Sequence, residues 1–179
     1  MYKRQQFTIA APGETTFFGL RGSGRYFAYV VDCSGSMQGP PLDRAREELI
    51  KSISRLPSGI EFRIVFFDHL TYEFPGGSQD FATASASSRQ RAESWIKGIN
   101  SGGGTDVKLG MKVVLSSNTK PDTVFLLTDG AFEFDAPQFI KSANTKDARV
   151  NTVAFVTQAG EALLKTIAKD NRGDYKFVP

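Results

Sequence analysis

Cysteine and histidine are almost absent from this chain of 179 residues, which contains one of each. The single cysteine, Cys33, excludes an internal disulfide bond. The single histidine, His69, falls in a predicted turn, and no Gly-x-Ser-x-Gly elbow is present. A serine hydrolase needs a base beside its nucleophile, so that class of enzyme is not expected. Gly-x4-Gly-Lys-Ser/Thr phosphate loops are absent as well.

Long apolar runs and blocks of one charge are also absent. No apolar stretch approaches the ~18 residues that a membrane-spanning helix requires, and the start, Met1–Gln6, lacks the apolar region of a signal peptide. Lys and Arg number 22 against 19 Asp and Glu, and they are interspersed, which gives a net charge of +3. We therefore expect no direct membrane insertion by this chain and no nucleic-acid partner.

The end of the sequence, Phe177–Pro179, stops directly after a predicted strand. We expect the chain to be a monomeric domain of a longer protein, whose targeting segments would lie elsewhere. The sequence does not determine the cellular compartment of the protein. We favour the cell envelope or the extracellular space over the cytoplasm.

Apolar residues make up 40% of the chain and charged residues 23%, which is typical of one globular domain. Runs rich in Val, Ile, Leu and Phe predict strands that are buried on both faces of a parallel sheet. After the turn-like pair Asp68-His69, Leu70–Phe74 predicts one short antiparallel edge strand. The predicted parallel strands are Tyr26–Val31, Phe62–Phe67, Thr123–Thr128, Val150–Val156 and Tyr175–Val178.

Helical patterns lie between these strands, and their alternation predicts a doubly wound α/β domain with a mostly parallel central sheet and helices on both faces. Residues 76–88, rich in Gly, Ser and Ala, predict a mobile surface loop. Residues 1–24 are expected to form an N-terminal extension that packs on the sheet, and residues 25–179 the domain itself. The predicted helices are Leu42–Leu56, Arg91–Ile99, Asp106–Ser116, Ala136–Ser142 and Glu161–Lys169.

The first parallel strand runs directly into the motif Asp32-Cys33-Ser34-Gly35-Ser36. Asp32, Ser34 and Ser36 bear oxygen at positions i, i+2 and i+4, at the carboxyl end of a strand, where open α/β sheets place their ligand sites. One carboxylate and two hydroxyls suit a hard cation that prefers oxygen ligands, such as Mg²⁺. Cys33 is expected to be buried and structural, since free cysteine behaves as a small apolar residue.

Two later loops supply another hydroxyl, from Thr105, and another carboxylate, from Asp129. Asp-x-Ser-x-Ser, then a distant Thr, then a distant Asp, resembles the metal-ion-dependent adhesion site of von Willebrand factor A domains. The resemblance runs from about Arg25 to the end of the chain. Two further segments, Phe17–Leu20 and Gly160–Leu164, resemble bacterial members of the family.

The resemblance implies a Rossmann-like domain that binds one divalent cation, and it implies no catalysis. Hydroxyl ligands do not cancel charge, so Mg²⁺ in such a site stays electropositive and keeps a replaceable water. Mn²⁺ and Ca²⁺ are alternatives. The implied partner is a protein that supplies a Glu or Asp carboxylate in place of that water. The implied ligands are Asp32, Ser34, Ser36, Thr105 and Asp129.

Other functions fit the same residues. One alternative is a coupling or scaffold module of a larger multidomain or ATPase-associated assembly. Another is a scaffold whose metal is purely structural. An aspartate-dependent phosphatase needs a second Asp two residues after Asp32, where this chain has Ser34. Asp68 is a candidate for the rim of the site. Asp106 is expected to cap the following helix instead of binding the cation.

Overall fold

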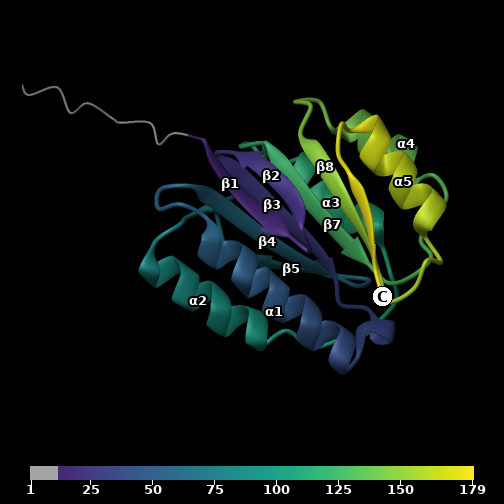
Figure 1. Ribbon diagram of the computed structural model, residues 1–179, viewed down its shortest axis with the longest axis horizontal. Helices are drawn as coiled ribbons and strands as arrows, with labels where there is room; N and C mark the ends of the chain where they lie inside the picture. The colour runs from purple at the N-terminus through teal and green to yellow at the C-terminus, as the bar shows by residue number, and fades with distance from the viewer. Residues whose placement is uncertain (1–11) are drawn as a thin grey trace, which may run out of the picture.

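A computed structural model of the protein describes residues 12–179 (Figure 1). The strands of its central sheet are β3 (Tyr26–Asp32), β4 (Glu61–Phe67), β5 (Thr71–Phe74), β6 (Ala82–Thr83), β7 (Thr123–Thr128), β8 (Arg149–Phe155) and β9 (Tyr175–Val178). They lie in the order β5-β4-β3-β7-β8-β9, with β6 paired to β4. The strands β3, β4, β7, β8 and β9 are mutually parallel, as their unbroken apolar runs predict.

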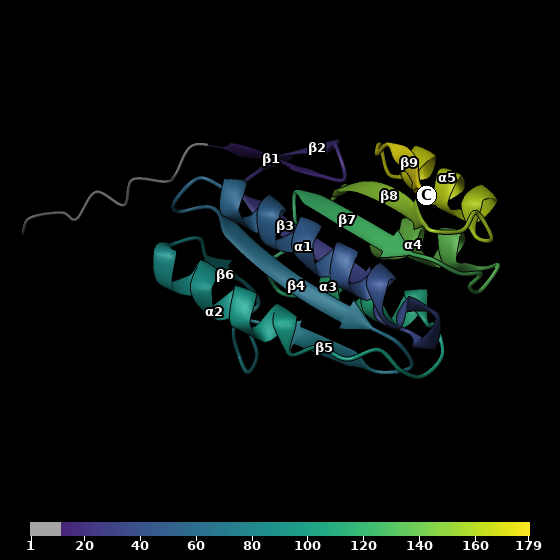
Figure 2. The same ribbon diagram turned by 60° about the horizontal axis from the view of Figure 1, so that its bottom comes forward.

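Helices cover both faces of the sheet. They are α1 (Pro40–Arg55), α2 (Ala86–Lys97), α3 (Val107–Leu115), α4 (Ala136–Ala143) and α5 (Glu161–Asp170), and a short 3-10 helix spans Gly35–Met37. Residues of α1 and α2 belong to the core on one face, and residues of α3, α4 and α5 belong to the core on the other (Figures 1 and 2). The prediction of a doubly wound, mostly parallel α/β domain is confirmed.

Part of the N-terminal extension forms a hairpin of β1 (Gly13–Phe17) and β2 (Leu20–Gly24). The hairpin lies beside α1 (Figure 2), and the buried ring of Phe17 has its centroid 5.6 Å from those of Tyr29 and Phe125. Thr15 donates a hydrogen bond to the backbone carbonyl of Ser52 in α1 at 2.8 Å. The hairpin therefore contributes to the core. Residues 1–11 of the predicted extension lie outside the described part of the chain.

The predicted loop at residues 76–88 is wrong in part, because the segment contains β6 and α2 begins at Ala86 instead of Arg91. Ser85 caps α2: its hydroxyl accepts from the Ser88 N–H at 3.1 Å, and the Ser88 hydroxyl accepts from the Ser85 N–H at 2.9 Å. Small polar residues typical of a loop thus begin a helix. The sheet also has two antiparallel strands, β5 and β6, instead of the one predicted.

The carboxyl ends of the parallel strands meet at one edge of the sheet. The strand β3 lies between β4 and β7, so the connections that follow β3 and β4 lead to opposite sides of it. This is the switch point at which open α/β sheets bind ligands. The loops after β3, β4, β7 and β8 all emerge at this edge.

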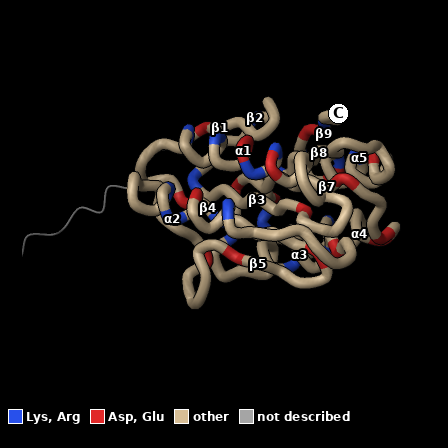
Figure 3. Tube along the Cα trace, turned by 90° about the horizontal axis from the view of Figure 1, so that it is seen from below, with Lys and Arg blue, Asp and Glu red and all other residues tan. Residues whose placement is uncertain are grey.

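The surface combines both signs of charge. Figure 3 shows Lys and Arg interspersed with Asp and Glu along the trace. Within residues 12–179, none of the helices has the length and apolar character needed to cross a membrane.

Candidate metal centre

Asp32 ends β3 and is fully buried. One carboxylate oxygen, Oδ1, accepts from the Ser34 N–H at 2.8 Å, and the other, Oδ2, accepts from the Thr128 hydroxyl at 2.6 Å. These two hydrogen bonds come from the loop after β3 and from the end of β7. They fix the orientation of the carboxylate at the switch point.

The hydrogen bonds extend from this carboxylate to Ser34, Ser36 and Asp129. The hydroxyl oxygens of Ser34 and Ser36 lie 3.2 Å apart, and the Ser36 hydroxyl donates to Oδ1 of Asp129 at 2.8 Å. Short hydrogen bonds therefore connect the Asp-x-Ser-x-Ser motif with the loop after β7. The structure brings together Asp32, Ser34, Ser36 and Asp129, which are four of the five ligands implied by the sequence.

Thr105, the fifth, lies on a loop that docks against the motif through its backbone. The Gly102 N–H donates to the Cys33 carbonyl at 2.9 Å, and the Gly35 N–H donates to the Gly103 carbonyl at 3.1 Å. In the described part of the chain, no hydrogen bond joins the Thr105 hydroxyl to the other four side chains. The loop that bears Thr105 thus docks on the motif, and the Thr105 hydroxyl is not part of the hydrogen-bonded cluster.

The charge of this cluster is negative and uncompensated. Asp129 is 5% exposed, and within residues 12–179 neither it nor Asp32 forms an ion pair with a basic side chain. Burial raises the pKa of Asp32, the nearby charge of Asp129 adds to the rise, and hydrogen bonds from Ser34 and Thr128 oppose it. Two buried carboxylates without a counterion are costly, and a bound cation would offset that cost.

The side-chain atoms that could bind a cation at this site are all oxygen atoms. Among the described residues, no three His, Cys, Asp or Glu side chains converge into a metal-binding group. A cation here would therefore depend on the hydroxyls of Ser34, Ser36 and Thr105 together with the two carboxylates. A set made only of oxygen atoms fits a hard cation such as Mg²⁺, Mn²⁺ or Ca²⁺.

The remaining candidates form hydrogen bonds outside this cluster or are buried beside it. Asp68, at 3% exposed, accepts from the Leu70 N–H at 2.6 Å and from the Tyr72 hydroxyl at 3.3 Å, so its carboxylate holds the turn between β4 and β5. Asp106 caps α3 by accepting from the Leu109 N–H at 2.8 Å, as predicted. Cys33 is fully buried, and burial raises the pKa of its thiol to about 12, with further contributions from nearby acidic groups.

Two threonines at the site were not predicted. Thr128 binds Asp32, and Thr157 donates from its hydroxyl to the backbone carbonyl of Asp129. The signal for Thr128 is a hydroxyl that ends an otherwise apolar buried strand, one residue before Asp129. Thr157 gives no such signal, because the contact depends on how the loop after β8 folds.

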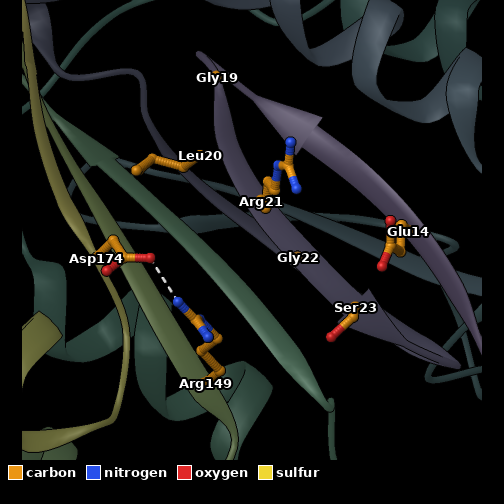
Figure 4. A pocket seen from close by; sticks show the side chains of 8 residues that line it. All are labelled: Glu14, Gly19, Leu20, Arg21, Gly22, Ser23, Arg149 and Asp174. Carbon is orange, nitrogen blue, oxygen red and sulfur yellow. Dashed lines mark hydrogen bonds and ion pairs between the residues drawn. The ribbon is translucent and has the colours of Figure 1, made fainter.

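A hollow in the surface lies away from this cluster. It measures about 460 Å³ and is lined by the β1–β2 hairpin together with Arg149 and Asp174, which form an ion pair of 2.5 Å (Figure 4). Glu14 and Arg21 add one charge of each sign to its wall. None of the five implied ligands lines this hollow.

Sequence comparison identifies the family. The model of the von Willebrand factor type A domain matches residues 27–177. A von Willebrand factor A domain-containing protein of Dictyostelium discoideum is 30% identical over 159 residues, covering 85% of this chain and 17% of that protein. A human inter-alpha-trypsin inhibitor heavy chain is 29% identical over 173 residues, covering 87% of this chain and 18% of that protein. The chain thus spans less than a fifth of these relatives' length.

Solved structures share the fold. The von Willebrand factor type A protein from Catenulispora acidiphila has a TM-score of 0.77 at 20% identity, over 89% of this chain and 40% of that chain. Proximal thread matrix protein 1 from the mussel byssus, with a zinc-occupied MIDAS motif, has a TM-score of 0.67 at 17% identity, over 85% of this chain and 41% of that chain. With the match that spans residues 27–177, the chain belongs to the von Willebrand factor type A domain family.

Proposed function

We propose that this domain binds one divalent cation, Mg²⁺ by preference, and through it captures a Glu or Asp carboxylate of a protein partner, without catalysis of its own. The observation that carries the proposal is the hydrogen-bonded cluster of Asp32, Ser34, Ser36 and Asp129. In it, the Ser34 N–H donates to Asp32, and the Ser36 hydroxyl contacts both the Ser34 hydroxyl and the Asp129 carboxylate. The cluster lies at the switch point of the sheet and contains buried negative charge that no basic side chain within residues 12–179 neutralises.

Each side chain has a part in this function. The hydroxyls of Ser34, Ser36 and Thr105 would hold the cation directly, while Asp32 and Asp129 balance part of its charge. Because the hydroxyls are neutral, the site would remain electropositive. The bound cation would supply a positive centre with one oxygen position open to a carboxylate. The zinc-occupied motif of the mussel protein supports a metal in this fold.

Titration calorimetry of the metal-free domain with Mg²⁺, Mn²⁺ and Ca²⁺ tests the proposal. We expect one saturable site in the wild type, and at least roughly tenfold weaker binding in Asp32→Ala and Ser36→Ala, since each removes an oxygen from the cluster. Ser54→Ala, on the exposed side of α1, is the matched control and should bind as the wild type does. Circular dichroism checks that each variant is folded.

Two results would count against the proposal. Equal affinity in Asp32→Ala and the wild type would exclude this cluster as the site. Absence of binding for all three cations would favour a second candidate, a coupling or scaffold module. That candidate draws support from the small share of its relatives that this chain covers.

A further inference from the structure

The backbone turn that follows β8 is strained. Val156 has a φ of 63°, and the Thr157 N–H donates to the Phe155 carbonyl at 2.6 Å, which closes a γ-turn around Val156. A β-branched residue at positive φ is an outlier, and a γ-turn of this hand is rare. Val156 is 42% exposed, so its side chain fills no gap in the core that would offset the strain. Contacts on either side of the turn must therefore hold it.

Hydrogen bonds hold this turn at both ends. Before it, the Val156 N–H donates to the Val178 carbonyl of β9 at 2.8 Å. After it, the Thr157 hydroxyl accepts from the Ala159 N–H at 3.3 Å and donates to the backbone carbonyl of Asp129. The turn thus directs the Thr157 hydroxyl toward the loop after β7, which comprises residues 129–135.

The loop after β8, residues 156–160, contacts the loop after β7 at a second point. Gly160 lies so close that a Cβ there would be 2.7 Å from the Gly130 carbonyl oxygen and 2.9 Å from the ring of Phe132. The two loops therefore pack directly against each other. Asp129 and Gly130, which are adjoining residues of the metal-centre loop, are both held from the side of β8.

Asp129 accepts a hydroxyl hydrogen bond at its backbone and another at its side chain. Thr157 binds the carbonyl, and the Ser36 hydroxyl donates to Oδ1 of the carboxylate at 2.8 Å. The charge of Asp129 is close enough to raise the pKa of Asp32. Two such carboxylates repel each other when no cation lies between them, so the loop after β7 needs a restraint. Since Ser36 is itself an implied ligand, Thr157 is the restraint from outside the cluster.

We propose that Thr157 is a positioning residue of the metal centre: its hydroxyl, directed by the strained turn at Val156, holds the loop after β7 so that the Asp129 carboxylate faces the bound cation. Thr157 itself does not touch the cation. Residues that orient metal ligands through hydrogen bonds change metal affinity by roughly 10–100-fold when they are replaced. The inference rests on the proposed function, because the cation is what Asp129 is positioned for.

Substitutions in the 179-residue chain test the inference. Thr157→Val removes the hydroxyl and keeps the shape of the side chain, while Thr157→Ser keeps the hydroxyl. Thr157 is exposed, so neither change disturbs the core. Val156→Pro keeps the hydroxyl but fixes φ at about −65°, which removes the turn. Thr166→Val is the matched control, because the exposed Thr166 donates its hydroxyl hydrogen bond to the Ala162 carbonyl within α5.

Calorimetry with Mg²⁺ and urea denaturation in EDTA are measured for each variant. Thr157→Val and Val156→Pro should bind Mg²⁺ roughly tenfold more weakly than the wild type, and Thr157→Ser and Thr166→Val should bind as the wild type does. A purely structural role would lower only the resistance to urea, because the affinity of the folded protein for Mg²⁺ would not change. Circular dichroism in EDTA checks folding, and Val156→Pro carries the test if Thr157→Val is unfolded.

Three results would overturn the inference. Wild-type affinity in Thr157→Val, or an equal loss of affinity in Thr157→Val and Thr157→Ser, would show that the hydroxyl does not position the site. Wild-type affinity in Val156→Pro would show that the turn does not direct it. Each of these results leaves the proposed function standing, since the wild type still binds Mg²⁺. Absence of Mg²⁺ binding in the wild type would overturn both.

Discussion

At the scale of single residues, Asp32 has two conflicting requirements. It must stay ionised to bind a cation, yet it is fully buried beside a second carboxylate, and burial raises its pKa. The hydrogen bonds from Ser34 and Thr128 hold its geometry but leave its charge uncompensated. In the metal-free protein this carboxylate therefore opposes folding at neutral pH, and a bound cation would reverse that effect.

Replacing Asp32 by Asn should reveal this cost as a dependence of stability on pH. The folded protein binds the Asp32 proton more tightly than the unfolded chain does, so this group's contribution to stability is present at low pH and is lost as pH rises through the folded pKa. In EDTA, the stability of Asp32→Asn relative to the wild type should thus increase from about pH 4 to about pH 7.

Urea denaturation of both proteins across that range measures the difference. Adding Mg²⁺ at pH 7 should stabilise the wild type alone. If the stability of Asp32→Asn relative to the wild type stays constant or falls as pH rises, the charge of Asp32 does not destabilise the folded protein.

At the scale of elements, the loop of residues 102–106 decides whether Thr105 reaches the cluster. Gly103 has a φ of +66°, and its carbonyl accepts from the Gly35 N–H. A Cβ at this position would collide with the ring of His69 and approach Oδ2 of Asp68 to 3.2 Å. Glycine is required there both by the backbone conformation and by the close approach.

Gly103→Ala and Gly104→Ala form a matched pair. The first should cost about 1–2 kcal/mol of stability, from left-handed backbone strain, and should weaken Mg²⁺ binding because the loop shifts. The second should stay within about 0.5 kcal/mol, because no atom lies within 4 Å of its Cβ position. Urea denaturation and calorimetry measure both quantities. Equal effects of the two substitutions would refute the role given to Gly103.

Element prediction succeeded where burial follows side-chain type and failed where it does not. The parallel strands have apolar side chains at nearly every position, so the sequence predicts them directly. In β2 the buried position Gly22 bears no side chain, because a Cβ there would lie 2.7 Å from Phe125 and Thr123. The alternation of buried and exposed positions in β2 therefore gives no apolar pattern in the sequence. The start of α2 after Ser85 gives none either.

At the scale of the whole molecule, the parallel sheet assembles the site from segments that lie far apart in the chain. Ser36 and Asp129 are 93 residues apart, and their side chains meet because β3 and β7 are neighbours. That Asp32, Ser34, Ser36 and Asp129 come together at this edge was predictable from the motif and the strand ends. Contacts between loops, such as that of Thr157 with Asp129, depend on backbone turns that the pattern does not encode.

A cation bound at this site would keep one coordination position open to a carboxylate of the partner. Water-proton relaxation of the Mn²⁺-loaded domain tests it most directly, because relaxation is enhanced only where a bound Mn²⁺ keeps exchangeable water. We expect an enhancement that is absent in Asp32→Ala and that falls when a short Glu-containing peptide is added. Bound Mn²⁺ whose relaxation shows no exchangeable water, or whose enhancement the peptide leaves unchanged, would contradict the account.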